Sequence, residues 1–296
     1  METGKKKKGE IRLGTSSWTA EGWEKAFYPP GTKDGDRIAC YATRFDTVEI
    51  DMTYYRVPST RMVESWREKT PPGFLFAAKA PQAATSDFTY EKGKRKANPD
   101  FLDPETMASF VSTLLALGDR LGPILVQLPY LAKGAFPGLP AFLERLEPFL
   151  DGLPPGPRYD VEIRNPSWFK PPLLEALRKR NVGLALTDLT LTRSGGGEYG
   201  PPTGPRLFEE IGESLVTSDH VYVRWLGNRK RIEEKTETFD RVIESRDEDL
   251  GPWAVLLRRL ADLGTDVFAY ANNHYEGYAP ETVRKIRGLL GIPEPG

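Results

Sequence analysis

The chain has 296 residues, of which 39% are hydrophobic and 28% charged, with a formal net charge of −1. This length suits one large α/β domain, and the near-neutral charge gives no global field for nucleic acid or an acidic membrane surface. The single cysteine, Cys40, excludes an internal disulfide, and only two histidines, His220 and His274, exclude a His-rich metal site.

The N-terminus and the hydropathy of the chain bear on its location in the cell. Four lysines stand at 5–8, within residues 1–9, which we predict to be a disordered basic tail. The sequence shows neither an apolar run of about 18 residues nor a signal-peptide pattern. We therefore expect a cytoplasmic protein with no membrane partner.

Eight short apolar or β-branched segments predict strands, at 11–16, 47–51, 74–80, 123–129, 159–165, 183–188, 220–227 and 266–273. Segments with helical periodicity lie between most of them, at 60–69, 104–121, 140–150, 171–180, 253–263 and 280–290. Alternating strands and helices predict a parallel sheet. Eight such units predict an α/β fold of the (β/α)8 TIM-barrel type, a single domain over residues 10–292. The first strand is followed by "GTSSWTAEGW" rather than a Gly-rich phosphate turn, which disfavours an open doubly wound sheet.

Three long connections follow predicted strands, at 81–103, 189–219 and 228–252. Loops after barrel strands form the C-terminal face, where active sites lie. We interpret these segments as lids or walls of a substrate site; tolerated surface insertions are the alternative.

Charged side chains alternate with apolar ones inside several predicted strands. In "TVEID", Glu49 lies on the opposite face from its two apolar neighbours. The pattern recurs in "DVEIRN" around Glu162, in "HVYVRWLG" around Arg224 and in "PILVQLP" next to Gln127. In a barrel, the apolar faces pack on the helices, so these polar side chains are predicted to point into the interior.

Interior charges must be paired, neutralised or wetted. One explanation is an ion-pair network in which Glu49 and Glu162 pair with Lys79, Arg164 and Arg224. The other is a polar pocket open at the C-terminal face. The pocket is favoured because the polar residues gather at the ends of the predicted strands. They are Asp51, Lys79, Gln127, Arg164, Asp188, Arg224 and Asn272.

The catalytic candidates are Glu49, Glu162, Lys79 and Asp188. Glu49 and Glu162, from different strands, suit a general acid and base. Lys79 suits a Schiff base, or alternatively a charge partner. Asp188 and Asp51 offer a second possibility, because together with the two glutamates they supply hard oxygen ligands for Mg²⁺ or Mn²⁺. No residue is assigned as a metal ligand, and the cofactor stays open.

The ligand-binding candidates supply anion recognition, hydroxyl recognition and stacking. Arg164 and Arg224 suit bidentate contacts to a carboxylate or phosphate. Side-chain amides and an imidazole suit hydroxyls, and aromatic rings after strands suit stacking on sugars or bases, with loop packing as the alternative. The full set is Trp18, Asp51, Tyr54, Gln127, Arg164, Arg224, Asn272, Asn273 and His274.

Seven ordered blocks carry a resemblance to a known family: "GTSSWTAEGWEKAFYPP", "YATRFDTVEIDMTYYRVPS", "WREKTPPGFLFAAKAP", "LGPILVQLP", "VEIRNPSW", "HVYVRWLG" and "ANNHYEGYAPETV". With them the chain resembles the YecE-like family, known as domain of unknown function 72. The resemblance implies a TIM barrel related to sugar-isomerase-like and endonuclease-like barrels, and it implies no reaction. The chain differs from many members at Asp51, where Asn is usual, at Leu226, where His is usual, and in "PQAATSD", which replaces a Thr-His pair.

Three hypotheses for the function follow. The first is an enzyme of isomerase, epimerase or lyase type, using acid–base chemistry on a small hydroxylated anion such as a sugar acid or sugar phosphate. The second is a nucleic-acid-binding or metal-dependent phosphodiester-processing barrel, suggested by the basic runs at 92–96 and 229–231. The third is a barrel that binds a small-molecule ligand without catalysis.

Overall fold

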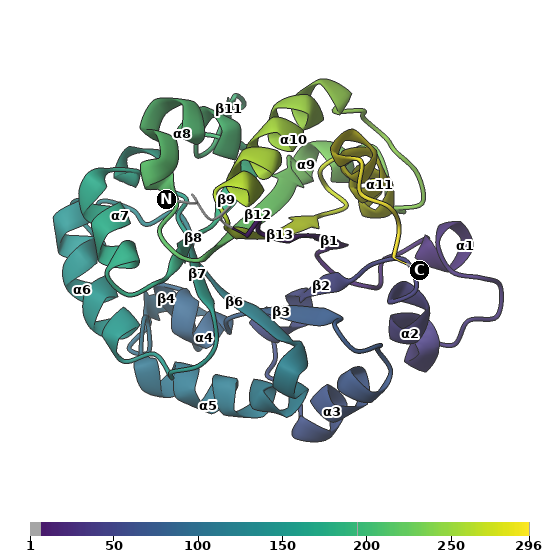
Figure 1. Cartoon of the computed structure of the whole chain (residues 1–296). Coiled ribbons are helices and arrows are strands. Elements are labelled where there is room, and N and C mark those ends of the chain that lie inside the picture. Colours follow the sequence, from purple (N-terminus) through teal and green to yellow (C-terminus); the bar gives the residue numbers. More distant parts are fainter. Residues whose placement is uncertain (1–6, 194, 296) are drawn as a thin grey trace, which may run out of the picture.

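A ring of parallel strands surrounded by helices forms the protein (Figure 1). The computed structural model describes residues 7–193 and 195–295. The ring consists of β1 (Ile11–Thr15), β2 (Thr47–Ile50), β3 (Leu75–Lys79), β6 (Leu121–Gln127), β7 (Tyr159–Glu162), β8 (Gly183–Leu184) with β9 (Leu186–Leu189), β12 (His220–Gly227) and β13 (Asp266–Ala271). The predicted (β/α)8 barrel is thus confirmed. Residues 1–6 of the predicted tail lie outside the described residues, and the backbone amide of Gly9 already donates a hydrogen bond to Ala261 O.

The ring is built from two parallel sheets, with strand orders β2-β3-β6-β7-β8 and β1-β13-β12-β9. They meet at the sixth strand position, where β8 pairs with β7 and β9 pairs with β12. At the other meeting point, the Tyr41 hydroxyl lies 2.9 Å from Thr15 N on β1 and 3.2 Å from Thr47 O on β2. A Cβ at Gly14 would lie 2.1 Å from Thr47 O, so the absence of a side chain there lets the two strands approach.

The outer layer contains α1 (Trp23–Ala26), α2 (Arg37–Tyr41), α3 (Thr60–Glu68), α5 (Pro104–Leu114), α6 (Leu139–Asp151), α7 (Pro171–Arg178), α8 (Gly204–Ile211), α10 (Asp247–Asp262) and α11 (Ala279–Leu290). Capping residues fix where two of these helices begin. The Ser59 side chain accepts from Met62 N at the start of α3, and the Asp103 side chain accepts from Thr106 N at the start of α5. The helix predicted at 253–263 begins earlier, at Asp247, because three acidic residues in its first turn favour a helix N-terminus. No helix in the described part of the chain is long and apolar enough to cross a membrane.

Two apolar layers follow from the alternation along the strands. Val48 and Ile50 belong to the core between strands and helices, whereas Glu49 points into the barrel, as predicted. The interior holds a separate small apolar cluster, made of Ala77, Leu125, Ala185, Tyr222, Phe268 and Tyr270. The polar network described below lies beside this cluster, since Tyr222 contributes to both.

The three long connections are partly ordered into secondary structure. The first contains α4 (Gln82–Thr85) and an antiparallel hairpin of β4 (Phe88–Glu91) and β5 (Lys94–Ala97). The second contains β10 (Leu191–Thr192), paired with β11 (Glu198–Tyr199), followed by α8. The third contains α9 (Arg229–Glu233) and the beginning of α10.

Candidate functional site

Arg224 lies at the centre of the barrel and links three strands. Its Nη2 donates to Glu49 Oε1 on β2 at 2.9 Å, and its Nη1 donates to Glu162 Oε2 on β7 at 2.7 Å. Nη1 also lies 2.7 Å from Gln127 Oε1 on β6. Both glutamates are fully buried, so one guanidinium compensates two interior carboxylates.

Protonation in this network follows from burial and pairing. Burial opposes a charge on Arg224, but Glu49 and Glu162 outweigh it and raise the pKa of Arg224 above its ordinary value. Burial and the Glu49 carboxylate raise the pKa of Tyr222, which therefore stays protonated and donates to Glu49 Oε2 at 2.7 Å. The ion-pair network that the sequence offered as one explanation is present for Arg224 and Arg164, whereas Lys79 pairs with Asp51 and with neither glutamate.

Arg164 extends this network toward solvent. Its Nε donates to Glu162 Oε1 at 3.0 Å, and its side chain is 22% exposed. Burial alone would raise the pKa of Glu162, but Arg224 and Arg164 outweigh it and hold that pKa below its ordinary value. Glu162 therefore remains ionised, with one oxygen on each arginine.

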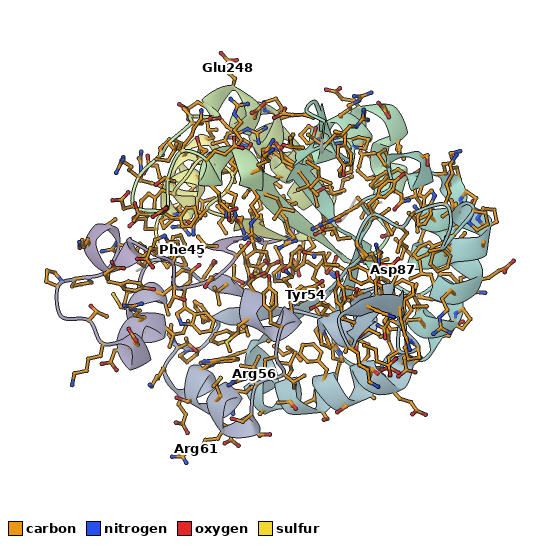
Figure 2. The ribbon with its side chains drawn as sticks, turned by 180° about the vertical axis from the view of Figure 1, so that it is seen from behind. Phe45, Tyr54, Arg56, Arg61, Asp87 and Glu248 are labelled. Carbon is orange, nitrogen blue, oxygen red and sulfur yellow. The ribbon has the colours of Figure 1, made fainter. Side chains whose placement is uncertain are left out.

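A second layer of polar groups lies at the mouth of the barrel. Lys79 Nζ lies 2.7 Å from Asp51 Oδ1 and 4.5 Å from the centre of the Tyr54 ring. Thr53 holds the turn Asp51–Tyr54 against β3, because its hydroxyl accepts a hydrogen bond from Lys79 N at 3.1 Å. Figure 2 shows Tyr54 near the middle of the ring of elements, with Arg56 and Arg61 successively farther out. Burial raises the pKa of Tyr54 and Arg164 lowers it, with the net shift upward.

Asp188 is not part of this cluster. Its Oδ1 accepts from Arg246 Nη2 at 3.1 Å, and its Oδ2 lies 3.3 Å from Trp253 Nε1 and 3.2 Å from the Tyr275 hydroxyl. Burial raises the pKa of Asp188 although Arg246 lowers it. Asp188 therefore points toward the helix layer, away from Glu162.

The remaining candidates occupy the rim. Trp18 packs edge-on against Trp66, with ring centres 5.4 Å apart, as the loop-packing alternative expects. Asn273 Oδ1 accepts from Ala279 N at the start of α11. Asn272 Oδ1 lies 2.6 Å from His274 Nδ1 and orients that ring.

His274 is a neutral ring at the edge of the site. Burial lowers the pKa of His274, and the nearby Glu233 carboxylate, 3.2 Å from Nε2, offsets this only in part. The lowered pKa favours the uncharged ring near pH 7, and both ring nitrogens already lie within hydrogen-bonding distance of protein oxygens.

The carboxylates do not fit a divalent cation. Within residues 7–193 and 195–295, no group of three or more His, Cys, Asp or Glu side chains is arranged to hold a metal ion. Glu49 and Glu162 share Arg224, Asp51 pairs with Lys79, and Asp188 pairs with Arg246. A Mg²⁺ or Mn²⁺ site would have to displace a cation at each of these positions, so we derive no step through a metal.

Tyr222 and Arg246, which contact Glu49 and Asp188, were not among the site residues predicted from the sequence. Tyr222 alternates with Arg224 in "HVYVRWLG", so the period of two already placed both on the inner face. Arg246 lies in the charged run "ESRDED", which carries no signal that distinguishes it from a solvated surface arginine.

Comparison with known proteins gives one family. A family model described as "Protein of unknown function DUF72" matches residues 12–295. The chain is 25% identical over 295 residues to UPF0759 protein YunF of Bacillus subtilis (strain 168), covering 97% of this chain and 96% of that protein. It is 30% identical over 153 residues to UPF0759 protein YecE of Escherichia coli (strain K12), half of each chain. The crystal structure of a DUF72 family protein from Thermotoga maritima MSB8 is similar with a TM-score of 0.69 and 23% identity, covering 95% of this chain and 99% of that one.

Proposed function

Because the chain belongs to the DUF72 family, whose description names no activity, we propose its function from the chemistry of the barrel mouth. We propose that the barrel binds a small hydroxylated anion, of the sugar-acid or sugar-phosphate class, above Arg164 and Lys79. On this ligand it would perform proton-transfer chemistry of the isomerase, epimerase or lyase type.

The observation that carries the proposal is the arrangement of Arg164. Only its Nε is engaged, with Glu162, and neither Nη donates a hydrogen bond to another residue in the described part of the chain. Glu162 is shared with Arg224, so it neutralises the charge of Arg164 only in part. A partly exposed guanidinium with two unused nitrogens suits a carboxylate or a phosphate.

Proton transfer is assigned to the layer that a ligand can reach. Asp51, with 35% of its side chain exposed, and its partner Lys79 form a base and an acid next to the proposed anion site. Glu49 and Glu162, the acid–base pair predicted from the sequence, lie below Arg164 with their oxygens on arginine or tyrosine. In this proposal they position the two arginines. Asn272 contributes a neutral amide for hydroxyls.

A thermal-shift screen tests this proposal. Sugar acids, sugar phosphates, nucleotides and neutral sugars are each added to the full chain and to the Arg164→Ala variant. A ligand at 100 times its dissociation constant stabilises by roughly 2.7 kcal/mol, which is readily measured. We expect a hydroxylated anion to stabilise the wild type and not the variant. The proposal is contradicted if an anion stabilises both proteins equally, or if no anion stabilises either of them. A ligand that binds but is not turned over favours the non-catalytic barrel.

A second candidate function, binding of single-stranded nucleic acid, is supported by the β4–β5 hairpin. Lys92 and Lys94 are exposed there, and Tyr90, which lies opposite Arg95 across the hairpin, is 67% exposed, so the hairpin combines cations with a stacking surface. Arg95 is itself paired with Asp87. The other basic run gives no such support. Arg229 and Lys230 in α9 pair with Glu233 and Glu234, and Arg231 pairs with Glu244.

A further inference from the structure

A cavity of about 290 Å³ lies between the connection 228–252 and the residues that follow β9, β12 and β13. Its lining includes Thr190, Asn228, Glu244, Arg246, His274 and Tyr275, and we name it the Arg246 cavity. We propose that the Arg246 cavity is a second ligand site, which takes a small uncharged polyhydroxylated compound the size of one sugar ring. This inference is independent of the anion site proposed above Arg164.

The outer wall of the cavity is held in place by a buried carboxylate. Glu276 is fully buried, and its Oε1 accepts from Arg246 N at 2.8 Å. Its backbone oxygen accepts from Ile243 N at 2.6 Å and from Glu244 N at 3.1 Å. At Gly277, with φ of +106°, a Cβ would lie 2.5 Å from Ile243 Cγ1, so the two segments pack in direct contact. The wall is therefore preformed, and binding does not have to order it.

The floor of the cavity presents a fixed donor. The Arg246 guanidinium carbon lies 4.2 Å from the centre of the Tyr275 ring, and its Nη2 and Nε are held by Asp188 and by Asp249, the latter at 2.8 Å. Asp188 is itself anchored by Trp253 and the Tyr275 hydroxyl. Nη1 donates no hydrogen bond within residues 7–193 and 195–295. A guanidinium fixed on three sides offers this nitrogen to a ligand at little entropic cost.

The charges around the cavity select the ligand class. Arg231 and Arg246 face three carboxylates, those of Glu198, Glu244 and Asp249. The carboxylates disfavour an anion, the guanidinium groups disfavour a cation, and the mostly polar lining disfavours an apolar ligand. A hydroxyl group donates to a carboxylate and accepts from a guanidinium at the same time, so a polyol satisfies both kinds of group.

The volume of the cavity and one lining residue, His274, narrow the class of ligand further. Small-molecule sites span roughly 300–1,000 Å³, so a cavity at the lower limit suits one sugar ring and is too small for a dinucleotide. His274 also lines the cavity, and because burial lowers its pKa, the ring adds no positive charge there near pH 7. The lining therefore differs in charge from the anion site proposed above Arg164.

Calorimetric titration of the full chain with D-xylose, D-glucose and myo-inositol tests the inference. Thr190→Trp and, separately, Ser245→Trp place a large side chain in the cavity without removing any of the ion pairs described above. Tyr90→Trp, on the exposed hairpin, is the matched control. We expect at least one compound to bind the wild type, the control and Arg164→Ala equally, and both filling variants to weaken it by about tenfold or more.

Three results overturn the inference, and the first two are that none of the three compounds binds the wild type, or that both filling variants bind as the wild type does. The third is a loss of binding in Arg164→Ala, which would place the compound in the anion site proposed above Arg164. Thermal unfolding of each variant checks that it folds. If Thr190→Trp does not fold, Thr190→Val, which replaces the hydroxyl by a methyl group, tests the same position. Failure of the anion screen leaves this test unaffected, because the two sites are probed with different compounds.

Discussion

Arg164 donates its Nε hydrogen to Glu162 Oε1 over 3.0 Å, and this bond connects the exposed mouth of the barrel to the buried charges below it. The other oxygen of Glu162 accepts from Arg224, which also holds Glu49. An accessible guanidinium and a fully buried one therefore share a single carboxylate. A substitution at either arginine should therefore change the same network. Two other features should respond separately: the seam where β1 and β2 meet at Tyr41, and the buried His220.

Removing the central cation should destabilise the fold strongly. Arg224→Met leaves Glu49 and Glu162 buried without their shared partner, and breaking a buried pair in this way costs about 3–5 kcal/mol. Urea unfolding of the wild type and variant measures the difference. The triple variant Glu49→Gln, Glu162→Gln, Arg224→Met removes all three charges and should recover most of the loss. A cost below about 1 kcal/mol for the single variant contradicts this account of the network.

Removing one hydroxyl should weaken the closure of the barrel. Tyr41→Phe takes away the group that lies between Thr15 N and Thr47 O at the meeting of β1 and β2. Unsatisfied buried polar groups cost about 1–3 kcal/mol, so we expect a decrease of that size in the free energy of unfolding. Tyr90→Phe, at an exposed position, is the control and should change stability little. Equal stability of the two variants would show that the hydroxyl does not support the seam.

Stability should fall at alkaline pH because of a buried histidine. His220 Nε2 lies 3.0 Å from Asp160 and Nδ1 lies 2.9 Å from Asp219. Burial opposes its charge, but Asp160 outweighs burial and raises the pKa of His220 from 6.5 to about 9. The stabilisation is therefore complete below about pH 6.5 and is lost as pH rises through about 9, a change of roughly 3 kcal/mol.

Urea unfolding at pH 6 and pH 9.5 measures this dependence. In His220→Gln the neutral amide cannot gain the proton, so the difference between the two pH values should shrink by most of that amount. An unchanged pH dependence in the variant would place its origin elsewhere.

The period of two along parallel strands made much of the site predictable. It placed Glu49, Glu162 and Arg224 on the inner face, and parallel strand ends brought Arg164 close to them. The same rule also fits Asp188, which shares its face with Leu184 and Leu186, both packed on the helices. Treating every polar strand end as inward was therefore too broad, because the alternation has to be followed in each strand.

Other features had weaker or no local signals. The hairpin inside 81–103 was predicted only as a loop, although Lys92 and Gly93, at φ of 50° and 77°, form its two-residue turn. The available sequence signal for this turn was "EKGK", in which a glycine stands between two segments of alternating residues. Asp188 and Arg246 are far apart in the chain, and Arg246 lies in a connection that has no periodicity. Only the tertiary structure therefore reveals their pairing.

Salt dependence separates the second candidate function from the first. If the hairpin binds a single-stranded oligonucleotide, removing one cation that neutralises a phosphate lowers the slope of log K against log salt by about 0.7. Replacing Lys92 and Lys94 by serine should therefore flatten the slope measured by fluorescence anisotropy. Arg229→Ser with Lys230→Ser, whose charges are already paired in α9, should change it little. Equal slopes for both sets of variants argue against the hairpin as the binding surface.

Titration of an anion onto Arg164 variants tests the central claim most directly. D-gluconate and D-glucose 6-phosphate represent the two proposed ligand classes and are titrated calorimetrically into the wild type, Arg164→Lys and Arg164→Ala. We predict that at least one binds the wild type, that lysine retains part of the affinity, and that alanine weakens binding by about tenfold or more, at least 1.4 kcal/mol. Binding to Arg164→Ala as tight as to the wild type would contradict the assignment of this arginine as the anion site.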